Sequence, residues 1–491
     1  MHSRHIRLAL ATAVAAAATG GLLGAAAGPS AAADSVHHHE ADFNHDGIGD
    51  VAFSAGYATV TGHTDAGQIV VLYGTKAGLD KAHRTTFSQD SPGVPGGAET
   101  GDAFGWSSSY GDFNHDGFDD LAVGAAYEEV DGDKTGGLVQ VLWGSPSGLS
   151  GGTTLTDPAP GSHDFWGRTL AAGDYDGDGK DDLAVGSSGA SVYVFKGGTA
   201  KTGTLGGQYA FKPPVQNASS DPHYNGPVTL VAGDVNGDGR SDLVVDGYDT
   251  ETESAWNKNF YLPGTASGLT GNNAVGLTPG IITDIGDVDN DGYGDIVSGI
   301  VWDKDSGVPG ATDGGKVALT HGSASGPAGT TTISQNTGAV PGASEKGDGF
   351  GGELSLGDIN GDHYLDLVVG ADFEDIDGVT DTGSVTVLYG SAQGIDTTSN
   401  IQYFSQNSAG VPGADEKSDR FGSEVKLTDV TGDGRADLTI GSFGENNYDG
   451  QLTYLPSAGT KLTTTGGRYF MAPDVGVSTA GQPMLGGNAA N

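Results

Sequence analysis

The sequence predicts an all-β protein, a seven-bladed β-propeller built of four-stranded antiparallel blades. An acidic nine-residue loop recurs seven times along the 491 residues, at intervals of 70, 62, 60, 53, 71 and 71 residues. A short apolar run, typical of a buried strand, follows each loop. A repeat of this size cannot bury its own apolar face, so neighbouring repeats must stack to form a core. Seven copies favour a closed ring.

Each repeat supplies the apolar runs of one blade. After the strand that follows the loop, a second apolar run ends in a turn, as at residues 70–74, 139–144 and 385–390. The turn repeats as Gly-(Ser/Thr)-x-x-Gly-(Leu/Ile/Pro) at 144–149, 264–269, 322–327 and 390–395. A Phe-Gly pair then follows at 104–105, 350–351 and 421–422, with Phe-Trp-Gly at 165–167 as a variant. About four strands per repeat are what a propeller blade requires. Blades three to five carry less regular motifs, so we expect them to be distorted.

The two chain ends are expected to close the ring in one blade. Only residues 34–41 precede the first loop, whereas the chain continues far beyond the seventh. Leu485-Gly486 stands where a Phe-Gly pair is due. We therefore expect the C-terminal segment to complete blade one, which removes exposed sheet edges.

The repeated loop predicts calcium. Its pattern, Asp-x-(Asn/Asp)-x-Asp-Gly-x-x-Asp, offers side-chain oxygens at positions 1, 3, 5 and 9 and a main-chain carbonyl at position 7. Calcium takes six to eight oxygens at about 2.3 to 2.6 Å, and glycine at position 6 allows a sharp turn around it. The bidentate glutamate and the helices of an EF-hand are missing, because a strand follows. A single loop could be an Asx turn on an acidic surface, but seven in register favour up to seven calcium ions.

The predicted calcium ligands are the residues at positions 1, 3, 5, 7 and 9 of the seven loops, taken in chain order: Asp42, Asn44, Asp46, Ile48, Asp50; Asp112, Asn114, Asp116, Phe118, Asp120; Asp174, Asp176, Asp178, Lys180, Asp182; Asp234, Asn236, Asp238, Arg240, Asp242; Asp287, Asp289, Asp291, Tyr293, Asp295; Asp358, Asn360, Asp362, Tyr364, Asp366; and Asp429, Thr431, Asp433, Arg435, Asp437. Loops three and five have four carboxylates each and should bind most tightly. Loop six has His363 where glycine is expected, and loop seven has Thr431 at position 3, so these two should bind most weakly.

These motifs together resemble the FG-GAP repeat family, which includes the N-terminal seven-bladed propellers of integrin α subunits. The resemblance rests on the Phe-Gly pairs, the calcium loops and a Gly-Ala-Pro-like end of the loop strand at 124–126, 186–188, 370–372 and 441–443. It covers almost all of the mature chain. This chain has a calcium loop in every blade, and in this respect it is similar to the bacterial secreted members of the family. The resemblance implies that the calcium loops lie on a lower face and that partners meet the opposite, upper face.

The N-terminus reads as a secretory signal. Arg4 and Arg7 give a basic start, residues 8–27 are apolar and rich in alanine, and Ala31-Ala32-Ala33 forms a small-residue cleavage site. We expect cleavage near Ala33, an extracellular mature protein, and one propeller domain over 34–491. An uncleaved signal anchor is the alternative. No later stretch is apolar for about 18 residues, so no membrane span is expected in the mature chain.

The net charge and the cysteine content limit how the loops can be held together and which classes of partner we expect. With no cysteine, disulfides cannot hold the loops. The formal charge is −41, and it becomes −43 without the two arginines of the signal. Because loop aspartates repel one another without metal, folding and calcium binding should be coupled. So acidic a surface excludes nucleic acid and anionic membranes as partners, and we expect a monomer.

The sequence specifies the function of this protein less precisely than its fold. Gly-x-Ser-x-Gly, His-Glu-x-x-His and P-loop motifs are absent, so no catalytic residue is assigned. The run His37–His39 is either a zinc ligand set or a solvated segment, and His163 beside Asp164 reads as structural. Hairpins 127–137, 301–315 and 372–383, with segments 88–105, 334–351 and 405–422, should form the upper face. That face is either a solvated acidic rim or a binding rim.

Four aromatic residues near this rim, Trp106, Trp166, Tyr127 and Phe373, could stack on sugar rings, or could belong to the core. We therefore expect an adhesion or ligand-binding module with an extracellular protein or a cell-wall glycan as partner. The alternative is an extracellular glycan lyase or hydrolase on the same scaffold.

Overall fold

The computed structural model describes residues 40–217, 219, 221–248 and 256–491. The predicted signal peptide and the run His37–His39 lie outside the described residues. Within them, no helix is both long enough and apolar enough to cross a membrane.

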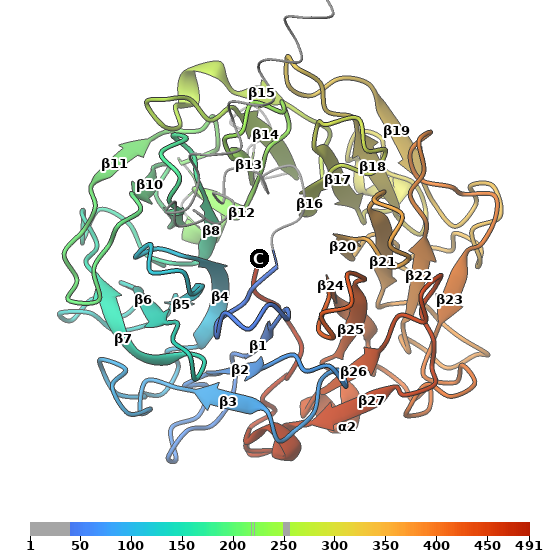
Figure 1. Cartoon of the computed structure of the whole chain (residues 1–491), viewed down its shortest axis with the longest axis horizontal. Helices are drawn as coiled ribbons and strands as arrows, with labels where there is room; N and C mark the ends of the chain where they lie inside the picture. Colours follow the sequence, from blue (N-terminus) through green and yellow to red (C-terminus); the bar gives the residue numbers. More distant parts are fainter. Residues whose placement is uncertain (1–39, 218, 220, 249–255) are drawn as a thin grey trace, which may run out of the picture.

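Seven sheets surround a central axis (Figure 1). In chain order, the blades consist of β1 (Val51–Ala55), β2 (Gln68–Leu72) and β3 (Arg84–Phe87); β4 (Phe104–Gly111), β5 (Asp120–Ala125), β6 (Leu138–Trp143) and β7 (Ser150–Leu155); β8 (Thr169–Gly173), β9 (Asp182–Gly186), β10 (Val192–Phe195) and β11 (Gln208–Phe211); β12 (Pro227–Gly233), β13 (Asp242–Tyr248), β14 (Asn257–Leu262) and β15 (Val275–Gly276); β16 (Ile282–Gly286), β17 (Asp295–Ile300), β18 (Lys316–Thr320) and β19 (Thr330–Ile333); β20 (Glu353–Gly357), β21 (Asp366–Ala371), β22 (Ser384–Leu388) and β23 (Gln402–Phe404); and β24 (Phe421–Thr428), β25 (Asp437–Ser442), β26 (Gln451–Leu455) and β27 (Arg468–Met471).

Every blade is an antiparallel meander whose strands follow one another in sequence order. In blades two to seven the first strand lies nearest the axis and the last lies at the rim (Figure 1). The predicted seven-bladed propeller is therefore confirmed. Blades three to five keep four strands each despite their less regular motifs, although β15 has only two residues.

The C-terminal segment supplies the innermost strand of blade one, as expected. The amide of Ser54 donates to the carbonyl of Asn488 at 2.8 Å. The amide of Ala490 donates to the carbonyl of Ala52 at 2.9 Å. Leu485 bridges Gly450 in the same parallel way as Phe350 bridges Gly315. Leu485-Gly486 thus takes the place of a Phe-Gly pair, and the ring closes with both chain ends in one sheet.

The apolar core lies between neighbouring blades. The phenylalanines of the Phe-Gly pairs, Phe104, Phe350 and Phe421, are completely buried. Their backbone lies directly against a glycine of the preceding blade: a Cβ on Gly383 would come within 2.2 Å of the Phe421 carbonyl oxygen. Gly383 also has φ +85°, which favours glycine. The motif therefore fixes how closely consecutive blades approach.

Inner strands are edge strands, and their free amides are satisfied by side chains of the preceding blade. Ser109 Oγ accepts from the amide of Ala172, and Thr169 Oγ1 accepts from that of Leu230, both at 2.9 Å. Asp284 in β16 and Ser355 in β20 accept in the same way from the next inner strand. These bonds tie the blades together around the axis.

The meander separates the two faces of the ring. We call the end that carries the nine-residue loops the lower face. In blades two to seven each loop joins the first and second strands, as residues 112–120 join β4 to β5, and loop one leads into β1. In an antiparallel meander the next connection lies at the other end. Hairpins 127–137, 301–315 and 372–383 therefore lie on the upper face, as expected.

Candidate metal centres

All seven loops adopt one geometry, which is set by their first aspartate. One carboxylate oxygen of that aspartate accepts from the amide of position 5 at 2.9 to 3.2 Å. The other accepts from the amide of position 6 at 2.6 to 2.9 Å. The loop is thereby wrapped around the carboxylate of position 1. The remaining predicted ligand positions lie within the same turn.

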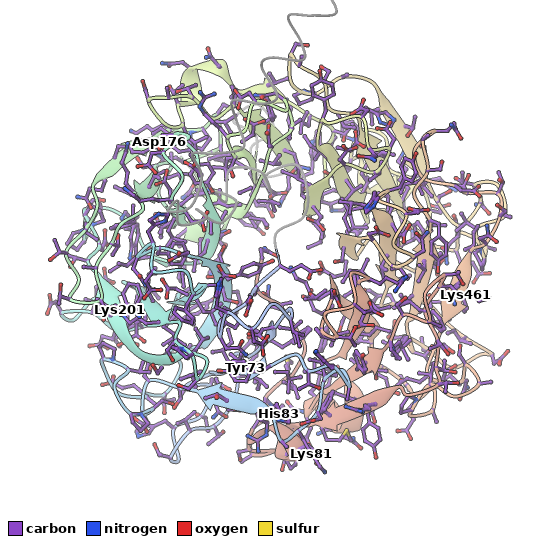
Figure 2. All side chains as sticks on the ribbon, viewed as in Figure 1. Tyr73, Lys81, His83, Asp176, Lys201 and Lys461 are labelled. Carbon is purple, nitrogen blue, oxygen red and sulfur yellow. The ribbon has the colours of Figure 1, made fainter. Side chains whose placement is uncertain are left out.

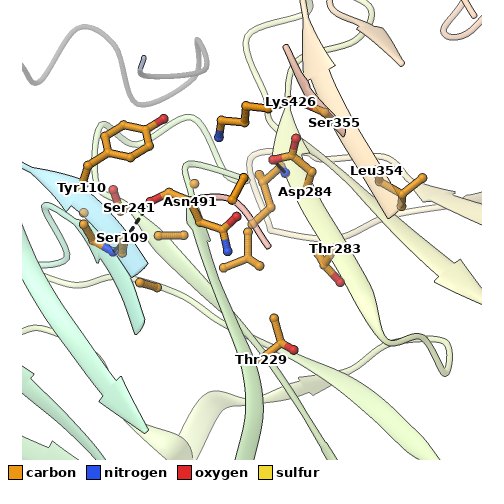
Figure 3. Close-up of a pocket in the computed structure, with 18 of the residues that line it drawn as sticks. Ser109, Tyr110, Thr229, Ser241, Thr283, Asp284, Leu354, Ser355, Lys426 and Asn491 are labelled. Atoms are coloured by element: carbon orange, nitrogen blue, oxygen red, sulfur yellow. Dashed lines mark hydrogen bonds between the residues drawn. The ribbon is translucent and has the colours of Figure 1, made fainter. Parts of the chain in front are cut away.

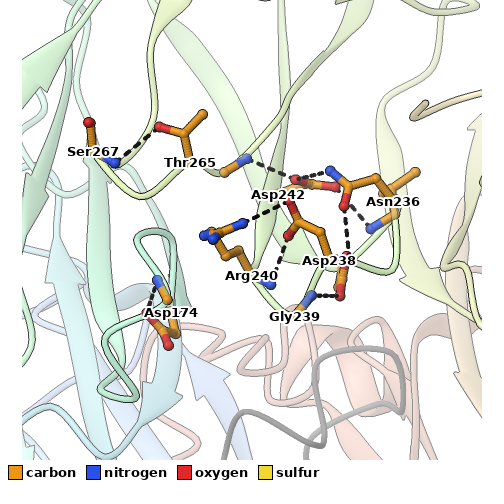
Figure 4. Close-up of polar contacts among 12 residues, drawn as sticks. Asp174, Asn236, Asp238, Gly239, Arg240, Asp242, Thr265 and Ser267 are labelled. Atoms are coloured by element: carbon orange, nitrogen blue, oxygen red, sulfur yellow. Dashed lines mark hydrogen bonds and ion pairs between the residues drawn. The ribbon is translucent and has the colours of Figure 1, made fainter. Parts of the chain in front are cut away.

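The ninth residue of each loop is a buried aspartate, at most 3% exposed. One of its oxygens accepts from the amide of the residue that opens the turn after the blade's next strand, at 2.7 to 2.9 Å in all seven blades. Figure 4 shows this arrangement in loop four around Asp242. The repeated turn therefore holds the last predicted ligand in place.

Position 2 anchors each loop to the core and was not used in the sequence prediction. It is apolar and almost completely buried in every copy: Phe43, Phe113, Tyr175, Val235, Val288, Ile359 and Val430. In loop one the amide of this residue donates to Asp50 at 2.9 Å. The signal was present in the sequence, because all seven copies have a large apolar residue at this offset.

The loops also contact one another around the lower face. The amide of Gly294 donates to the carbonyl of Asp234, and the amide of Ala436 donates to the carbonyl of Asp358. The bond from Gly49 to the carbonyl of Asp429, 2.9 Å long, joins blade one to blade seven. A cation held in one loop would therefore also stiffen the contact with the neighbouring blade.

Burial raises the pKa of the position 9 carboxyl groups far above the usual range. The pKa rises to about 8 for Asp50, Asp120 and Asp366. It rises to about 7 in loops three, four and seven and to about 6 in loop five. Loss of water around the charged form is the main cause, and the hydrogen bond from the turn amide offsets part of it. A buried carboxylate of this kind is stabilised by a nearby cation.

Several oxygens in the loops fit such a cation. Asp182 Oδ2, Asp289 Oδ1 and Asp437 Oδ2 are buried without a hydrogen-bond partner. In loops three and five the side chains of positions 1, 3 and 5 each bring one carboxylate oxygen within 4.8 Å of the others. Hard oxygen donors gathered in this way suit calcium. The carboxylate groups of loops three and five are therefore close enough to one another to hold one calcium ion in each loop.

Basic side chains contact several loops, which the sequence prediction did not foresee. Lys196 contacts Asp176 in loop three, and Lys201 lies 2.9 Å from Asp116 in loop two. Figure 2 labels Asp176 and Lys201. Arg240 pairs with Asp238 in loop four at 2.9 Å (Figure 4). The contact of Lys196 affects the expected ranking of the loops by calcium affinity, because its ammonium group would compete with an ion for Asp176 in loop three.

Loop six keeps the common geometry in spite of His363. This residue has φ +71°, and its amide donates to Asp358 Oδ2 at 2.8 Å, as the glycine amide does elsewhere. Its side chain is 83% exposed. A left-handed conformation costs a non-glycine residue about 1 to 2 kcal/mol.

The substitution His363→Gly should therefore stabilise the protein by about 1 kcal/mol and tighten calcium binding in loop six. Calcium titrations followed by thermal melting would check both effects. The matched control is Gly434→His, the reverse change at the same position of loop seven, where φ is +81°. It should destabilise by a similar amount. If His363→Gly is neutral or destabilising, strain at position 6 does not limit loop six.

The upper face carries a row of aromatic rings across blades one to four. Tyr57, Trp106, Tyr127, Phe165 and His223 follow one another with ring centroids 6.4, 5.2, 5.2 and 4.9 Å apart. We call these five residues the aromatic arc. Tyr57 is 39% exposed, and Trp106 and Tyr127 are partly exposed.

The suggestion that Trp166 stacks on a sugar is wrong. This side chain is 1% exposed and packs against Tyr193, Phe195 and His163 inside blade three. His163 is buried with it, in keeping with a structural role. Phe373 is exposed, but the guanidinium of Arg420 lies 3.6 Å from its ring centre. Of the four proposed aromatic residues, Trp106 and Tyr127 belong to the arc.

A cavity of about 310 Å³ opens beside the arc on the upper face. Tyr57, Trp106, Arg168, Phe443 and Met484 line it, together with polar residues of the inner strands. Two guanidinium nitrogens of Arg168 donate to backbone carbonyls, those of Asn225 at 3.0 Å and His223 at 3.3 Å. Apolar rings and a placed charged group in one concavity are typical of a ligand site.

A second cavity, of about 240 Å³, lies on the axis between the inner strands (Figure 3). It is lined by Tyr110, Asp284, Glu353, Glu424 and Lys426, among others. Burial raises the pKa of Glu424 to about 8 and lowers that of Lys426. These groups come from β4, β16, β20 and β24 and place charged side chains at the axis.

The acidic hairpins are anchored at blade boundaries by glutamine side chains. Gln89 Nε2 donates to Glu128 at 2.7 Å, and Gln335 Nε2 donates to Glu374 at 2.6 Å. Gln406 donates in the same way to Glu445, at the start of the short helix α2 (Glu445–Tyr448). The recurring Ser-Gln pairs thus lock each outgoing segment to the hairpin of the next blade. The base of these hairpins is structural, and their tips face solvent.

Comparison with known proteins supports the repeat assignment. Residues 104–150 and 350–388 match the FG-GAP repeat, and residues 174–245 match the FG-GAP-like repeat. Phosphatidylinositol-glycan-specific phospholipase D of Bos taurus is 33% identical over 148 residues, which are 30% of this chain and 18% of that protein. Integrin alpha-PS5 of Drosophila melanogaster is 36% identical over 165 residues, or 32% and 15% of the two chains.

Integrin alpha-8 of Mus musculus is 29% identical over 236 residues, which are 44% of this chain and 20% of the relative. The matched part thus spans a fifth or less of each of these curated relatives.

Proposed function

We propose that this chain, which contains FG-GAP repeats and is similar in part to integrin α subunits, is a secreted calcium-binding propeller whose upper face binds an extracellular ligand. Its calcium loops stabilise the ring from the lower face, and its upper face provides the adhesive surface. The signal-like sequence of residues 1–33 supports export.

One observation supports this proposal above the others: the cavity of about 310 Å³ that lies beside the aromatic arc. Tyr57 and Trp106 both belong to the arc and line the cavity. Aromatic faces bind apolar side chains and the faces of sugar rings, and polar groups beside them fix orientation. A protein loop or a cell-wall glycan is therefore the partner that this surface fits.

A binding screen tests this function. The mature chain, loaded with calcium, would be screened against glycan arrays and secreted proteins, alongside Trp106→Ala and Tyr57→Ser. We expect both variants to lose at least tenfold in affinity for any ligand of the upper face, because ring contacts near the centre of an interface contribute most of the binding energy.

The matched control is Tyr469→Ala. Tyr469 is 51% exposed but lies on β27, at the rim of blade seven and outside the arc. This variant should bind normally. Binding unchanged in Trp106→Ala and Tyr57→Ser would exclude the arc as the site. Turnover of a polysaccharide by the wild-type protein would favour the enzyme alternative.

A further inference from the structure

One position in each blade lies next to the turn that holds the calcium loop of that blade. It stands immediately before the turn residue whose amide donates to position 9, and in chain order it is Tyr73, Trp143, Lys196, Pro263, His321, Tyr389 or Pro456. In blade three this side chain contacts position 3 of the loop, through Lys196 and Asp176. Blade five has an imidazole here, which could add a nitrogen ligand to loop five.

His321 is in reach of two loop carboxylates. Its Nδ1 lies 3.3 Å from Asp295 Oδ1. One atom from each of Asp289, Asp295 and His321 lies within 4.8 Å of the other two. Asp289 Oδ1 is buried and has no hydrogen-bond partner. The three side chains therefore converge on one point, where one carboxylate oxygen is left unsatisfied.

The chemistry of this group differs from that of an all-oxygen loop. Calcium and magnesium prefer oxygen ligands, whereas imidazole nitrogen suits zinc and other first-row transition ions. A tetrahedral zinc ion with ligands at about 2.0 to 2.1 Å has neighbouring ligand atoms about 3.3 Å apart. The separation of His321 Nδ1 and Asp295 Oδ1 matches this spacing.

We propose that loop five is a mixed nitrogen and oxygen site that selects a divalent transition ion such as Zn²⁺ over calcium, with Asp289, Asp295 and His321 as its protein ligands. This inference rests on the proposed role of the loops as cation sites. It separates loop five from the other six, which keep calcium. The propeller then carries two kinds of metal site on one face.

A simple ion pair does not account for the arrangement equally well. His83 and Asp80 form such a pair, 3.0 Å apart, on an exposed stretch between β2 and β3. There, one exposed carboxylate meets one exposed imidazole. At His321 two carboxylates converge, and Asp295 is 2% exposed. The buried side chain of Asp295 and the buried Oδ1 atom of Asp289 beside one imidazole favour a bound divalent ion, whose charge offsets both carboxylates.

Metal titration of the chelator-stripped mature protein tests the proposal. His37–His39 would be replaced by alanine, so that their imidazoles do not add to the signal. Zn²⁺ would be titrated calorimetrically in a large excess of calcium. We expect one equivalent to bind, and Co²⁺ to give a visible absorption band of a nitrogen-ligated ion that Zn²⁺ abolishes.

His321→Tyr is the informative variant, because tyrosine stands at this position in blades one and six. It should weaken Zn²⁺ binding at least tenfold and leave the melting temperature in calcium almost unchanged. Asp289→Asn, away from the turn, should also lose Zn²⁺ binding. His83→Ala should bind Zn²⁺ as the unsubstituted protein does.

Equal Zn²⁺ affinity in the unsubstituted and His321→Tyr proteins, or displacement of Zn²⁺ by calcium, would overturn the proposal and leave an ion pair. The proposed structural role of calcium is tested separately, by whether calcium stabilises the protein. If calcium does not stabilise the protein but one Zn²⁺ still binds through His321, the proposed calcium function fails and the loop five inference stands.

Discussion

Chelation of calcium is expected to lower the melting temperature of the mature protein by tens of degrees, and added calcium to restore it. A ligand held at 100 times its dissociation constant stabilises the folded state by about 2.7 kcal/mol per site. Six such sites, one in each loop other than loop five, together exceed the total stability of an ordinary domain, about 5 to 15 kcal/mol. The chelated protein should therefore be marginally folded or unfolded. Thermal melting at low ionic strength measures this directly.

The effect of pH on the chelated protein follows from the position 9 carboxyl groups. Their pKa is near 3.8 in an unfolded chain, and burial raises it to about 8 in Asp120 and to about 6 in Asp295. Between these limits the folded state binds more protons than the unfolded state. The free energy of unfolding therefore falls as pH rises from about 4 to about 8.

Calcium reverses this slope, because protons then compete with the ion for the same oxygens. We expect the chelated protein to be more stable at pH 5 than at pH 8, and the calcium-loaded protein to show the opposite order. Magnesium should restore stability poorly, since it requires near-octahedral geometry and keeps its waters. Equal melting curves with and without chelator would remove the structural role of the loops.

The substitution Asp120→Asn is expected to have the largest effect of any single change in a loop. The asparagine keeps an oxygen that can accept from the amide of Gly144, which lies 2.8 Å from Asp120. It removes the buried negative charge that a cation would offset. In calcium the variant should lose about 3 kcal/mol, measured by chemical denaturation.

The same variant should behave differently without metal. Removal of an unpaired buried charge relieves its desolvation cost, so chelated Asp120→Asn should be at least as stable as the chelated wild type at pH 8. Asp131→Asn, on an exposed upper-face hairpin, is the matched control and should change neither state. Equal losses with and without calcium would mean that Asp120 acts through its hydrogen bond alone.

Much of the fold could be predicted because the repeats encode it locally. Loop, strand and turn recur in phase, and the Phe-Gly pairs mark where blades meet. Even the substitution of Leu485-Gly486 for Phe-Gly was recognisable from its place in the repeat, and the structure confirms it. A ring of similar units has few ways to assemble, so the local pattern determined the topology.

Side-chain contacts, both within a blade and between blades, were harder to predict. The contact of Lys196 with Asp176 joins residues 20 positions apart through a turn, and no local pattern distinguishes this lysine from other surface lysines. The aromatic arc draws its five residues from four blades, so their order emerges only when the ring closes. The burial of Trp166 depends on its position beside Phe165, which the variant motif obscured.

Metal content of the folded protein tests the central claim most directly. The mature chain would be stripped with chelator, dialysed against millimolar calcium and micromolar zinc, and analysed by mass spectrometry of its metals, with folding monitored by circular dichroism. The account predicts about one calcium ion for each all-oxygen loop and about one zinc ion for loop five. A protein that remains folded at neutral pH with less than one bound metal ion per chain would contradict it.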